Sequence, residues 1–421
     1  MREPRVIDAR EVRPRHGRLR RHRPLRSALA VAAMALSAML VAGIGVVAFS
    51  VLQFSSNLET IDLAGGDHPL PEFENQRGAF SVLVVGSDTR DGQQSTNAVH
   101  PGQELNDVTM LLHVHEDHQG ATVVSFPRDL IVDFPTCPAT GEDGIEVPAA
   151  SGVQLNTALH RGGLPCAVAL IESMTGLQIP YVAKITFDGV INMSTAVGGV
   201  PVCFAGPIDD PWSDLQIPAA GTYELEGEQA LQFLRSRHGV GDGSDLARIS
   251  SQRVFLSALI RKVQSDEVLG NFGSLYQIAQ VASQNMTLST SLSDPATMVG
   301  MANVLRKIPL ETMQFVTYPT VPLGQRVAPD YYTADIMMEL IRNDQEVPLD
   351  PSQLGAGSAE TASPEPGDEP ADDPQQSPSA DPAATDAPDA SAAPDEDLTG
   401  IEGRIDGQSA EQESCVVPFG W

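Results

Sequence analysis

AFSVLVVG at residues 79–86, VTMLLHV at 108–114 and ATVVSF at 121–126 are the three segments that decide the fold. Each is a short run of aliphatic and β-branched residues, which is typical of a buried strand. The polar EDHQ turn between the second and third segments predicts a hairpin. Helical periods follow, as in LPCAVALIESMTG at 164–176 and in the apolar stripe of residues 246–263. This alternation of strands and helices predicts an α/β domain.

The N-terminal part of the chain predicts a membrane anchor. Residues 1–26 carry ten Arg and three acidic residues, and residues 27–52 follow as an apolar stretch without charge. A spanning helix needs about 20 apolar residues, whereas the apolar region of a cleaved signal peptide, the alternative, has only about 7–15. We therefore predict one transmembrane helix at 27–52, and the positive-inside rule keeps the basic segment 1–26 in the cytoplasm. A stalk at 53–74 and a folded extracytoplasmic domain at 75–348 follow, so the predicted location is the cell membrane.

The last part of the chain has the composition of a disordered tail. Residues 355–400 contain twelve acidic residues, eight Pro and no basic residue, which is too little apolar surface to bury a core. We predict a Pro/Ala/Asp-rich disordered tail over residues 349–421. The net charge of −29, with its only basic block in the first 26 residues, excludes a nucleic-acid partner for the folded domain.

Four arginines gather within LRSRHGVGDGSDLARISSQR, residues 234–253. They are Arg235, Arg237, Arg248 and Arg253. A cluster of this kind in an acidic domain favours a site for a concentrated anion, because the planar guanidinium grips two phosphate oxygens at once. We expect Asp245 to cap the helix that begins here and Arg248 to lie on its polar face, with Gln252. The alternative is an exposed, salt-bridged helix face.

Acidic residues stand where two of the predicted strands meet. Asp88 follows the first strand in VVGSDTR, and Asp107 precedes the second in NDVT. If the strands are neighbours, the two carboxylates lie close together, and two carboxylates plus substrate phosphates are a usual setting for Mg²⁺. A solvated turn with an ordinary Asp is the alternative interpretation. Arg128 and Asp129 follow the third strand in SFPRDL.

These motifs, taken in order, resemble those of the LytR-CpsA-Psr family, in its actinobacterial type. The motifs are VVGSDTR, NDVTMLLHV, VVSFPRDL, LNTALHRGG, ALIESMTGLQIPYVAKITFDG, VGGVPV, LEGEQALQFLRSRHG and GSDLARISSQR, within residues 75–348. The resemblance implies a three-layer α-β-α domain around a central mixed β-sheet. It further implies a membrane-anchored, magnesium-dependent phosphotransferase, which moves a glycopolymer from an undecaprenyl-pyrophosphate carrier to peptidoglycan as a phosphodiester.

The resemblance also implies roles for individual residues. Asp88 and Asp107 match the family's magnesium-associated acids, and with Arg237 and Arg248 they make the expected catalytic set. The expected pyrophosphate-binding arginines are Arg90, Arg128, Arg235, Arg237, Arg248 and Arg253. The chain departs from the family at Leu105-Asn106-Asp107, where an Arg often stands two residues before the Asp.

Two other functions remain open at this point. A hydrolase of the same lipid pyrophosphate would use the same pocket with water as the acceptor. A non-catalytic module that binds glycan or lipid phosphate would keep the arginines but would not need both acids. The general base is also open between Asp107 and Asp129.

The four cysteines suggest disulfides, since the folded domain is predicted to lie in an oxidising compartment. We predict that Cys137 pairs with Cys166, closing a loop of about thirty residues worth ~3 kcal/mol. Whether Cys203 and Cys415 pair across the predicted tail stays open.

Overall fold

The computed structural model describes residues 58–63, 78–88, 104–139, 145–265, 268, 272–350, 352–360 and 404–421. Contacts divide the chain into two units, residues 1–53 and 54–421, and every described residue belongs to the second. The predicted transmembrane helix at 27–52 and basic segment 1–26 lie outside the described residues. Among those that are described, no helix has the length and apolar character needed to cross a membrane.

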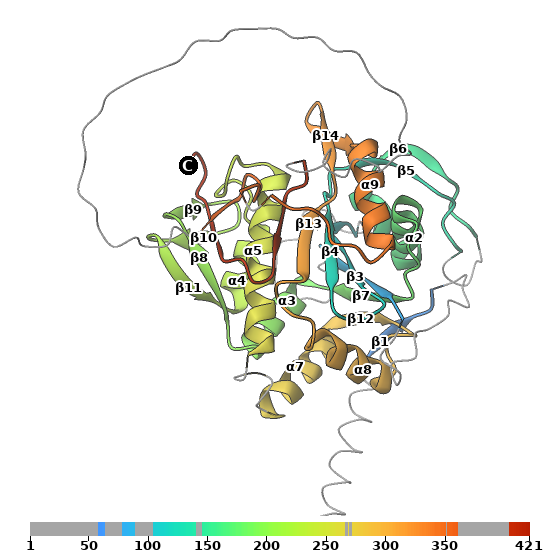
Figure 1. Cartoon of the computed structure of the whole chain (residues 1–421), viewed down its shortest axis with the longest axis horizontal. Helices are drawn as coiled ribbons and strands as arrows, with labels where there is room; N and C mark the ends of the chain where they lie inside the picture. The colour runs from blue at the N-terminus through green and yellow to red at the C-terminus, as the bar shows by residue number, and fades with distance from the viewer. Residues whose placement is uncertain are drawn as a thin grey trace, which may run out of the picture. The chain divides into compact units, whose positions relative to one another are not determined.

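A mixed eight-stranded sheet forms the centre of the domain (Figure 1). The strands lie in the order β1 (Glu59–Ile61), β12 (Met286–Ser289), β7 (Tyr181–Ile185), β2 (Phe80–Ser87), β3 (Asn106–Val114), β4 (Ala121–Phe126), β13 (Met313–Thr317) and β17 (Gly407–Ser409). β2, β3 and β4 form an antiparallel meander, which confirms the predicted hairpin, while β7 pairs parallel with β2, and β13 with β4. The carboxyl ends of β2, β4, β7 and β13 therefore lie at one edge of the sheet.

Helices cover both faces of this sheet because successive strand residues point to opposite sides. Leu83 and Val85 of β2 pack in one apolar cluster with α2 (Ala158–Thr175) and α9 (Tyr331–Arg342). Val82 belongs to a second cluster on the other face, with α8 (Pro295–Leu305) and part of α5 (Asp245–Gln264). The predicted layering of helices around a central mixed sheet is thus present. α3 (Phe187–Ala196), α4 (Gly227–Arg235) and α7 (Phe272–Asn285) complete the helices of the described residues.

A second sheet lies on the far side of α5. Its order is β11 (Gly221–Leu225), β8 (Val200–Phe204), β18 (Ser414–Val416) and β16 (Ser358–Glu360). Val254, Phe255 and Ala258 of α5 pack against β8 and α4 in a third apolar cluster. Helix α5 is consequently covered on two sides rather than one. Three two-stranded ribbons complete the strands: β5 (Ile131–Phe134) with β6 (Ala150–Gln154), β9 (Ile208–Asp210) with β10 (Leu215–Ile217), and β14 (Thr320–Leu323) with β15 (Arg326–Pro329).

The structure corrects the predicted tail at 349–421. Residues 361–403 lie outside the described residues, but residues 404–421 fold back onto the domain. β17 pairs with β13 at the edge of the central sheet, and β18 inserts between β8 and β16. Buried Ile405, Val416 and Val417 give this segment the apolar surface that residues 355–400 lack. The prediction of disorder is therefore wrong for residues 404–421, because it was based on the composition of residues 355–400.

The predicted stalk at 53–74 is also partly wrong, because β1 (Glu59–Ile61) pairs with β12. Ile61 and Leu63, on either side of Asp62, pack against one core cluster, and Leu58 packs against the other. This short alternation is a strand signal that the polar composition of the segment conceals.

Candidate active site

Several of the sequence-predicted residues meet at the edge of the central sheet where β2 and β4 end and β3 begins. Gly86 pairs with Val108 and Ser87 with Asn106, so the two strands are neighbours, with Asp88 directly after β2 and Asp107 at the start of β3. The loop after β4 brings Arg128, and the segment between α4 and α5 brings Arg237 to the same place. The edge thus gathers acids and arginines from four separate parts of the chain.

Arg128 is held by the carboxylate at the start of β3. Its Nη1 donates to Asp107 Oδ1 at 2.5 Å, and its Nε lies 3.8 Å from Asp129 Oδ2. Pro127 cannot donate to the ladder and ends β4, which releases Arg128 into the loop. The backbone carbonyl of Arg128 then accepts a hydrogen bond from Asn156 N at 3.1 Å, which fixes the loop.

Arg237 lies in a turn organised by a buried acid. Asp210 Oδ2 accepts hydrogen bonds from Ser236 Oγ at 2.7 Å and from the backbone N–H groups of Arg237 and Gly239 at 3.2 Å. Burial raises the pKa of Asp210, but these hydrogen bonds outweigh it and the net pKa is lowered. Asp210 therefore stays ionised and presents the Arg237 guanidinium to the site, with Nη2 3.7 Å from Asp129 Oδ2.

Arg248 lies on the first turns of α5 and is buried, with 4 % of its surface exposed. Its Nη2 is 2.7 Å from Asp245 Oδ1 and donates to the carbonyl of Asp107 at 3.0 Å. The expectation of an outward polar face is wrong, because α5 is covered on both sides; Gln252 is also buried and donates to Leu234 O at 2.8 Å. The expected cap is wrong too, since Ser244, not Asp245, accepts from Ala247 N. The Asp245 carboxylate forms ion pairs with arginine side chains instead.

Three arginines converge on Asp245. Its Oδ1 lies 2.7 Å from Arg248 Nη2, 3.6 Å from Arg128 Nε and 3.9 Å from Arg237 Nε. Within the described residues, the Nε atoms of all three arginines are buried donors without an aligned hydrogen-bond partner, and so is the acceptor Asp245 Oδ1. Unsatisfied buried donors are costly. Three arginines with incompletely satisfied donors around one carboxylate form a concentration of positive groups that an anion could contact.

Burial and charge act in opposite directions on the pKa values of these arginines. Burial lowers the pKa of Arg128, but the nearby charges of Asp107 and Asp245 outweigh it and the net pKa is raised. Burial dominates for the more enclosed Arg248 and lowers its pKa, despite the same two acids. Arg248 is thus the more desolvated of these two arginines, and its lowered pKa reflects burial more than a lack of acidic neighbours.

The two acids expected to hold magnesium are both tied into this edge. Asp88 Oδ1 accepts from Leu105 N at 2.7 Å, and Asp107 Oδ1 accepts from Arg128. Within the described part of the chain, no group of three or more His, Cys, Asp or Glu side chains forms a ready-made metal site. Two carboxylates nevertheless suit a Mg²⁺ ion that takes its remaining ligands from phosphate and water.

The structure does not bring all the expected arginines to the cluster. Arg90 lies outside the described residues. Arg235 is exposed and its guanidinium lies 4.9 Å over the Phe187 ring. Arg253 is 2 % exposed and donates to the carbonyls of Leu354 and Asp406 at 2.5 and 2.8 Å. The expectation that Arg253 binds pyrophosphate is wrong, because its guanidinium is enclosed by the returning C-terminal segment, and burial lowers its pKa to about 10.

Sequence reasoning missed two positioning acids. Asp210 gives no signal except its place in the turn-rich stretch DDPWSD (209–214). Asp245 was interpreted as a helix cap because it stands next to the helix start, one residue after the true cap. Both disulfides form, Cys137–Cys166 as predicted and Cys203–Cys415, the pairing left open.

The chain belongs to the LytR_cpsA_psr family, whose model matches residues 50–343. It is 27 % identical over 282 residues to the cell wall biosynthesis protein LcpA of Corynebacterium glutamicum, covering 62 % of this chain and 53 % of that protein. It is 33 % identical over 223 residues to the probable cell wall biosynthesis protein LcpB of the same organism, covering 51 % and 48 %. The chain thus spans about half the length of these two curated relatives.

Another relative and two solved structures complete the comparison. The polyisoprenyl-teichoic acid–peptidoglycan teichoic acid transferase TagT of Bacillus subtilis is 26 % identical over 273 residues, covering 63 % of this chain and 77 % of that protein. The LytR-Csp2A-Psr enzyme from Actinomyces oris has a similar fold, with a TM-score of 0.50 and 20 % identity over 68 % of this chain and 95 % of that one. Protein gbs0355 from Streptococcus agalactiae gives a TM-score of 0.52 and 22 % identity over 65 % and 90 %.

Proposed function

We propose that this protein is a membrane-anchored extracytoplasmic phosphotransferase. It transfers a glycopolymer from an undecaprenyl-pyrophosphate carrier to a hydroxyl group of peptidoglycan and leaves a phosphodiester. The observation that carries the proposal is the convergence of Arg128, Arg237 and Arg248 at one edge of the sheet, with Nε donors that make no well-aligned hydrogen bond. The names of its relatives, a teichoic acid transferase and cell wall biosynthesis proteins, support the same class of reaction.

The arginines would bind the pyrophosphate and stabilise the charge that grows on the leaving phosphate. Phosphoryl transfer depends mostly on positioning and charge neutralisation, and less on covalent help from the protein. Partly or fully buried guanidinium groups suit this task because acidic partners hold them in place before the substrate arrives. Asp129 and Asp245 hold Arg237 from two sides, so its guanidinium is oriented without a ligand.

The charge balance of the cluster fits a magnesium ion arriving with the substrate. Arg128, Arg237 and Arg248 face Asp107, Asp129 and Asp245, three positive against three negative charges. Asp88, at the same edge, adds a fourth negative charge, so a pyrophosphate entering this site needs a further cation. Asp88 and Asp107 would hold Mg²⁺ through oxygen, and the ion would supply positive charge to the phosphate oxygens.

The reaction forms one bond and breaks one. The peptidoglycan hydroxyl oxygen attacks the phosphorus linked to the glycopolymer, and the bond from that phosphorus to the bridging pyrophosphate oxygen breaks. The lipid leaves as its monophosphate. The hydroxyl proton goes to Asp129, whose nearest arginine nitrogen lies 3.7 Å away, whereas Asp107 is bound to Arg128 at 2.5 Å. Asp129 Oδ1 accepts from Gln154 Nε2 at 3.0 Å, which orients it.

Mass spectrometry of the reaction products tests the proposal. The full chain in detergent is incubated with a lipid-pyrophosphate oligosaccharide, Mg²⁺ and soluble peptidoglycan fragments. We expect a phosphodiester-linked product together with lipid monophosphate. Release of lipid monophosphate and sugar phosphate without the linked product would instead assign a hydrolase, and binding without either product would assign a non-catalytic module.

Asp88→Asn tests the role of magnesium separately. An amide is a neutral and weaker ligand for a hard cation. We expect this variant to lose both the activity and its response to Mg²⁺ titration, while its melting temperature without Mg²⁺ stays near that of the wild type. Full activity of Asp88→Asn with unchanged Mg²⁺ response would remove Asp88 from the metal site.

A further inference from the structure

The last five residues of the chain are built against the loop that carries Arg237. Gly241 N donates to Val417 O at 3.0 Å, Phe419 N to Gly239 O at 3.0 Å and Gly420 N to Gly241 O at 3.1 Å. The disulfide of Cys415 to Cys203 fixes the same segment to β8. These residues lie beyond residues 50–343, the part that matches the family. They therefore lie outside the part that matches the family model and beside the loop of Arg237.

This fixed segment turns large aromatic side chains to solvent. Phe419 is 61 % exposed and Trp421 is 75 % exposed, and Trp212 on the neighbouring β9–β10 connection is 80 % exposed. The Trp212 ring lies 5.6 Å from that of His238, in the turn beside Arg237. We call Trp212, Phe419 and Trp421 the aromatic face. A group of exposed aromatic side chains on an ordered backbone indicates a binding surface, whereas single exposed hydrophobic residues are common on any protein.

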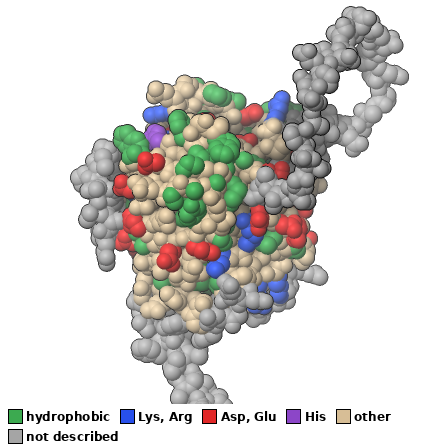
Figure 2. Space-filling model, turned by 90° about the vertical axis from the view of Figure 1, so that its left-hand side faces the viewer, with side chains coloured by type: hydrophobic (Ala, Val, Ile, Leu, Met, Phe, Trp, Pro, Cys, Tyr) green, Lys and Arg blue, Asp and Glu red, His purple; other side chains and the backbone are tan. Residues whose placement is uncertain are grey.

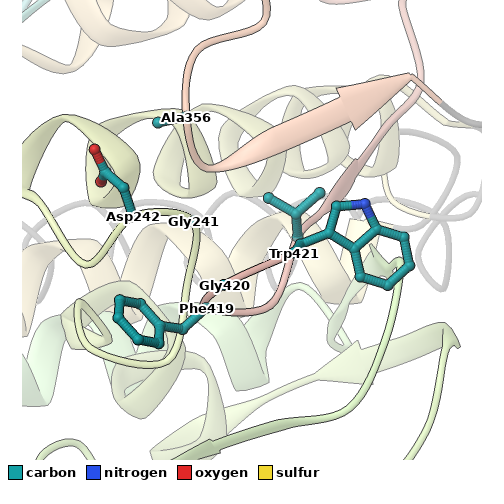
Figure 3. Close-up of a pocket in the computed structure, with 7 residues that line it drawn as sticks. Gly241, Asp242, Ala356, Phe419, Gly420 and Trp421 are labelled. Atoms are coloured by element: carbon teal, nitrogen blue, oxygen red, sulfur yellow. The ribbon is translucent and has the colours of Figure 1, made fainter.

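A hollow of about 360 Å³ is lined by two residues of this face, Phe419 and Trp421. Its lining residues are Gly241, Asp242, Ala356, Val417, Phe419, Gly420 and Trp421. Figure 3 shows Asp242 and Phe419 on one side of the hollow and Trp421 on the other, with Gly241 and Gly420 between them. Its size is at the lower end of the range of small-molecule sites, about 300–1,000 Å³.

Glycines let the backbone lie close to the two aromatic rings. A Cβ atom on Gly206 would lie 3.1 Å from Trp421 Cζ3, and one on Gly243 would lie 3.0 Å from Phe419 Cε2. Gly243 also has a φ of 78°, a conformation that other residues rarely adopt. The two rings thus rest on backbone on one side and leave the other side to solvent.

We propose that the aromatic face and Asp242 form a binding subsite for a saccharide chain. Sugar rings present C–H groups that pack on aromatic faces and hydroxyl groups that donate to carboxylates. Asp242 supplies such a carboxylate, oriented by the hydrogen bond that its Oδ1 accepts from Ser244 N at 2.9 Å. Figure 2 shows hydrophobic side chains on this face of the molecule with acidic side chains beside them and few basic ones. This pattern suits neutral sugars and opposes anionic lipid or nucleic acid.

The hollow and the arginine cluster share one segment of the chain, which favours a saccharide as the ligand of the hollow. The segment 237–245 supplies Arg237 and Asp245 to the cluster at its ends and Asp242 to the hollow at its middle. A ligand whose phosphate lies at the arginines would extend its sugar residues toward the aromatic face. The inference rests on the proposed function and names a subsite for the glycan part of its donor or acceptor.

Tryptophan fluorescence tests the subsite directly, since the chain contains two Trp residues, 212 and 421, and both belong to the aromatic face. Trp212→Phe leaves Trp421 as a single reporter. The full chain in lipid nanodiscs is titrated with soluble peptidoglycan glycan strands in one arm and phosphate-free pentose and hexose oligosaccharides in the other. We expect a saturable blue shift in at least one arm, which assigns the subsite to the acceptor or to the transferred polymer.

Variants distinguish a built subsite from a passive surface. In the Trp212→Phe background, Phe419→Ala and Asp242→Asn should each weaken saccharide binding about tenfold. Tyr332→Ala, which removes a similarly exposed ring (62 %) on α9, should leave binding unchanged. No saturable change with any saccharide, or binding that survives both substitutions, would overturn the proposal. Quenching of Trp421 by brominated lipids would overturn it too, because the face would then lie in the membrane.

This experiment separates the subsite from the proposed reaction, since the probes carry no phosphate and nothing is transferred. Absent saccharide binding alongside measurable phosphodiester formation would reject the subsite alone. Saccharide binding without any transfer would reject the proposed reaction and leave the subsite standing.

Discussion

Replacing Cys415 with serine removes the covalent bond between the returning C-terminal segment and β8. Cys203 and Cys415 are 212 residues apart, whereas Cys137 and Cys166 are separated by 29. The loop-closure model gives about 5 kcal/mol for the longer loop and about 3–4 kcal/mol for the shorter. At ~2 °C per kcal/mol for a domain of this size, Cys415→Ser should lower the melting temperature by about 10 °C.

The loss has a local part that a melting curve alone does not reveal. β18 lies between β8 and β16, so its release exposes two strands of the second sheet and weakens the support of the 239–241 loop. We expect limited proteolysis to cut residues 404–421 of the Cys415→Ser protein under conditions in which the wild type resists cleavage. Dithiothreitol should also expose residues 404–421 of the wild type to cleavage, although it reduces the Cys137–Cys166 disulfide as well.

Glu360→Ser serves as the matched control, because it replaces an exposed residue on β16, the strand next to β18, without touching the disulfide. Its melting temperature should stay within about 2 °C of the wild type, as expected for a surface substitution. A Cys415→Ser protein that melts at the wild-type temperature and resists proteolysis would refute the reasoning, since the segment would then be held without the bond.

Three further results are expected. Arg253→Met removes the buried donor to the carbonyls of Leu354 and Asp406 and should lower the free energy of unfolding in urea by about 3–5 kcal/mol, while a wild-type value would show that these contacts are dispensable. Burial lowers the pKa of His113, with Asp344 opposing it, so the folded state binds fewer protons than the unfolded chain. The free energy of unfolding should therefore fall as the pH drops through 6.5, and His113→Gln should flatten that fall; equal slopes between pH 5 and 7 would contradict this. Replacing residues 361–403 with a Gly/Ser linker of equal length should leave the melting temperature unchanged, and a loss of several degrees would show that they pack on the domain.

The core of the fold was predictable because its segments carry strong local patterns. The meander β2–β3–β4 and the helix that ends at Gly176 follow from apolar runs, a polar turn and a C-terminal glycine. The second sheet could not be predicted in the same way. β8 is an apolar segment, but its partner β18 comes from a part of the chain more than 200 residues away, and pairing over that distance leaves no mark in local periodicity.

The candidate site was predictable in its residue types and less so in its contacts. Asp107, Arg128 and Arg248 meet as expected because neighbouring strands and one helix start share an edge. The role of Arg253 was predicted wrongly, because its spacing from Arg248 in the sequence does not indicate which residues pack over α5. The covering residues come from the tail, whose acidic composition hid the apolar residues near its end.

The most direct test of the central claim is the rate of phosphodiester formation in arginine variants. Arg237→Ala and Arg248→Lys should each lower the rate by about 30- to 1,000-fold, since each loses about 2–4 kcal/mol of transition-state stabilisation. Arg237 is half-buried, so its truncation should keep the fold, which circular dichroism and melting curves verify. Arg306→Ala, at the exposed end of α8, should keep the wild-type rate. Folded Arg237→Ala and Arg248→Lys proteins with near wild-type rates would contradict the account, because the arginine cluster would then be a structural ion-pair network and no transfer site.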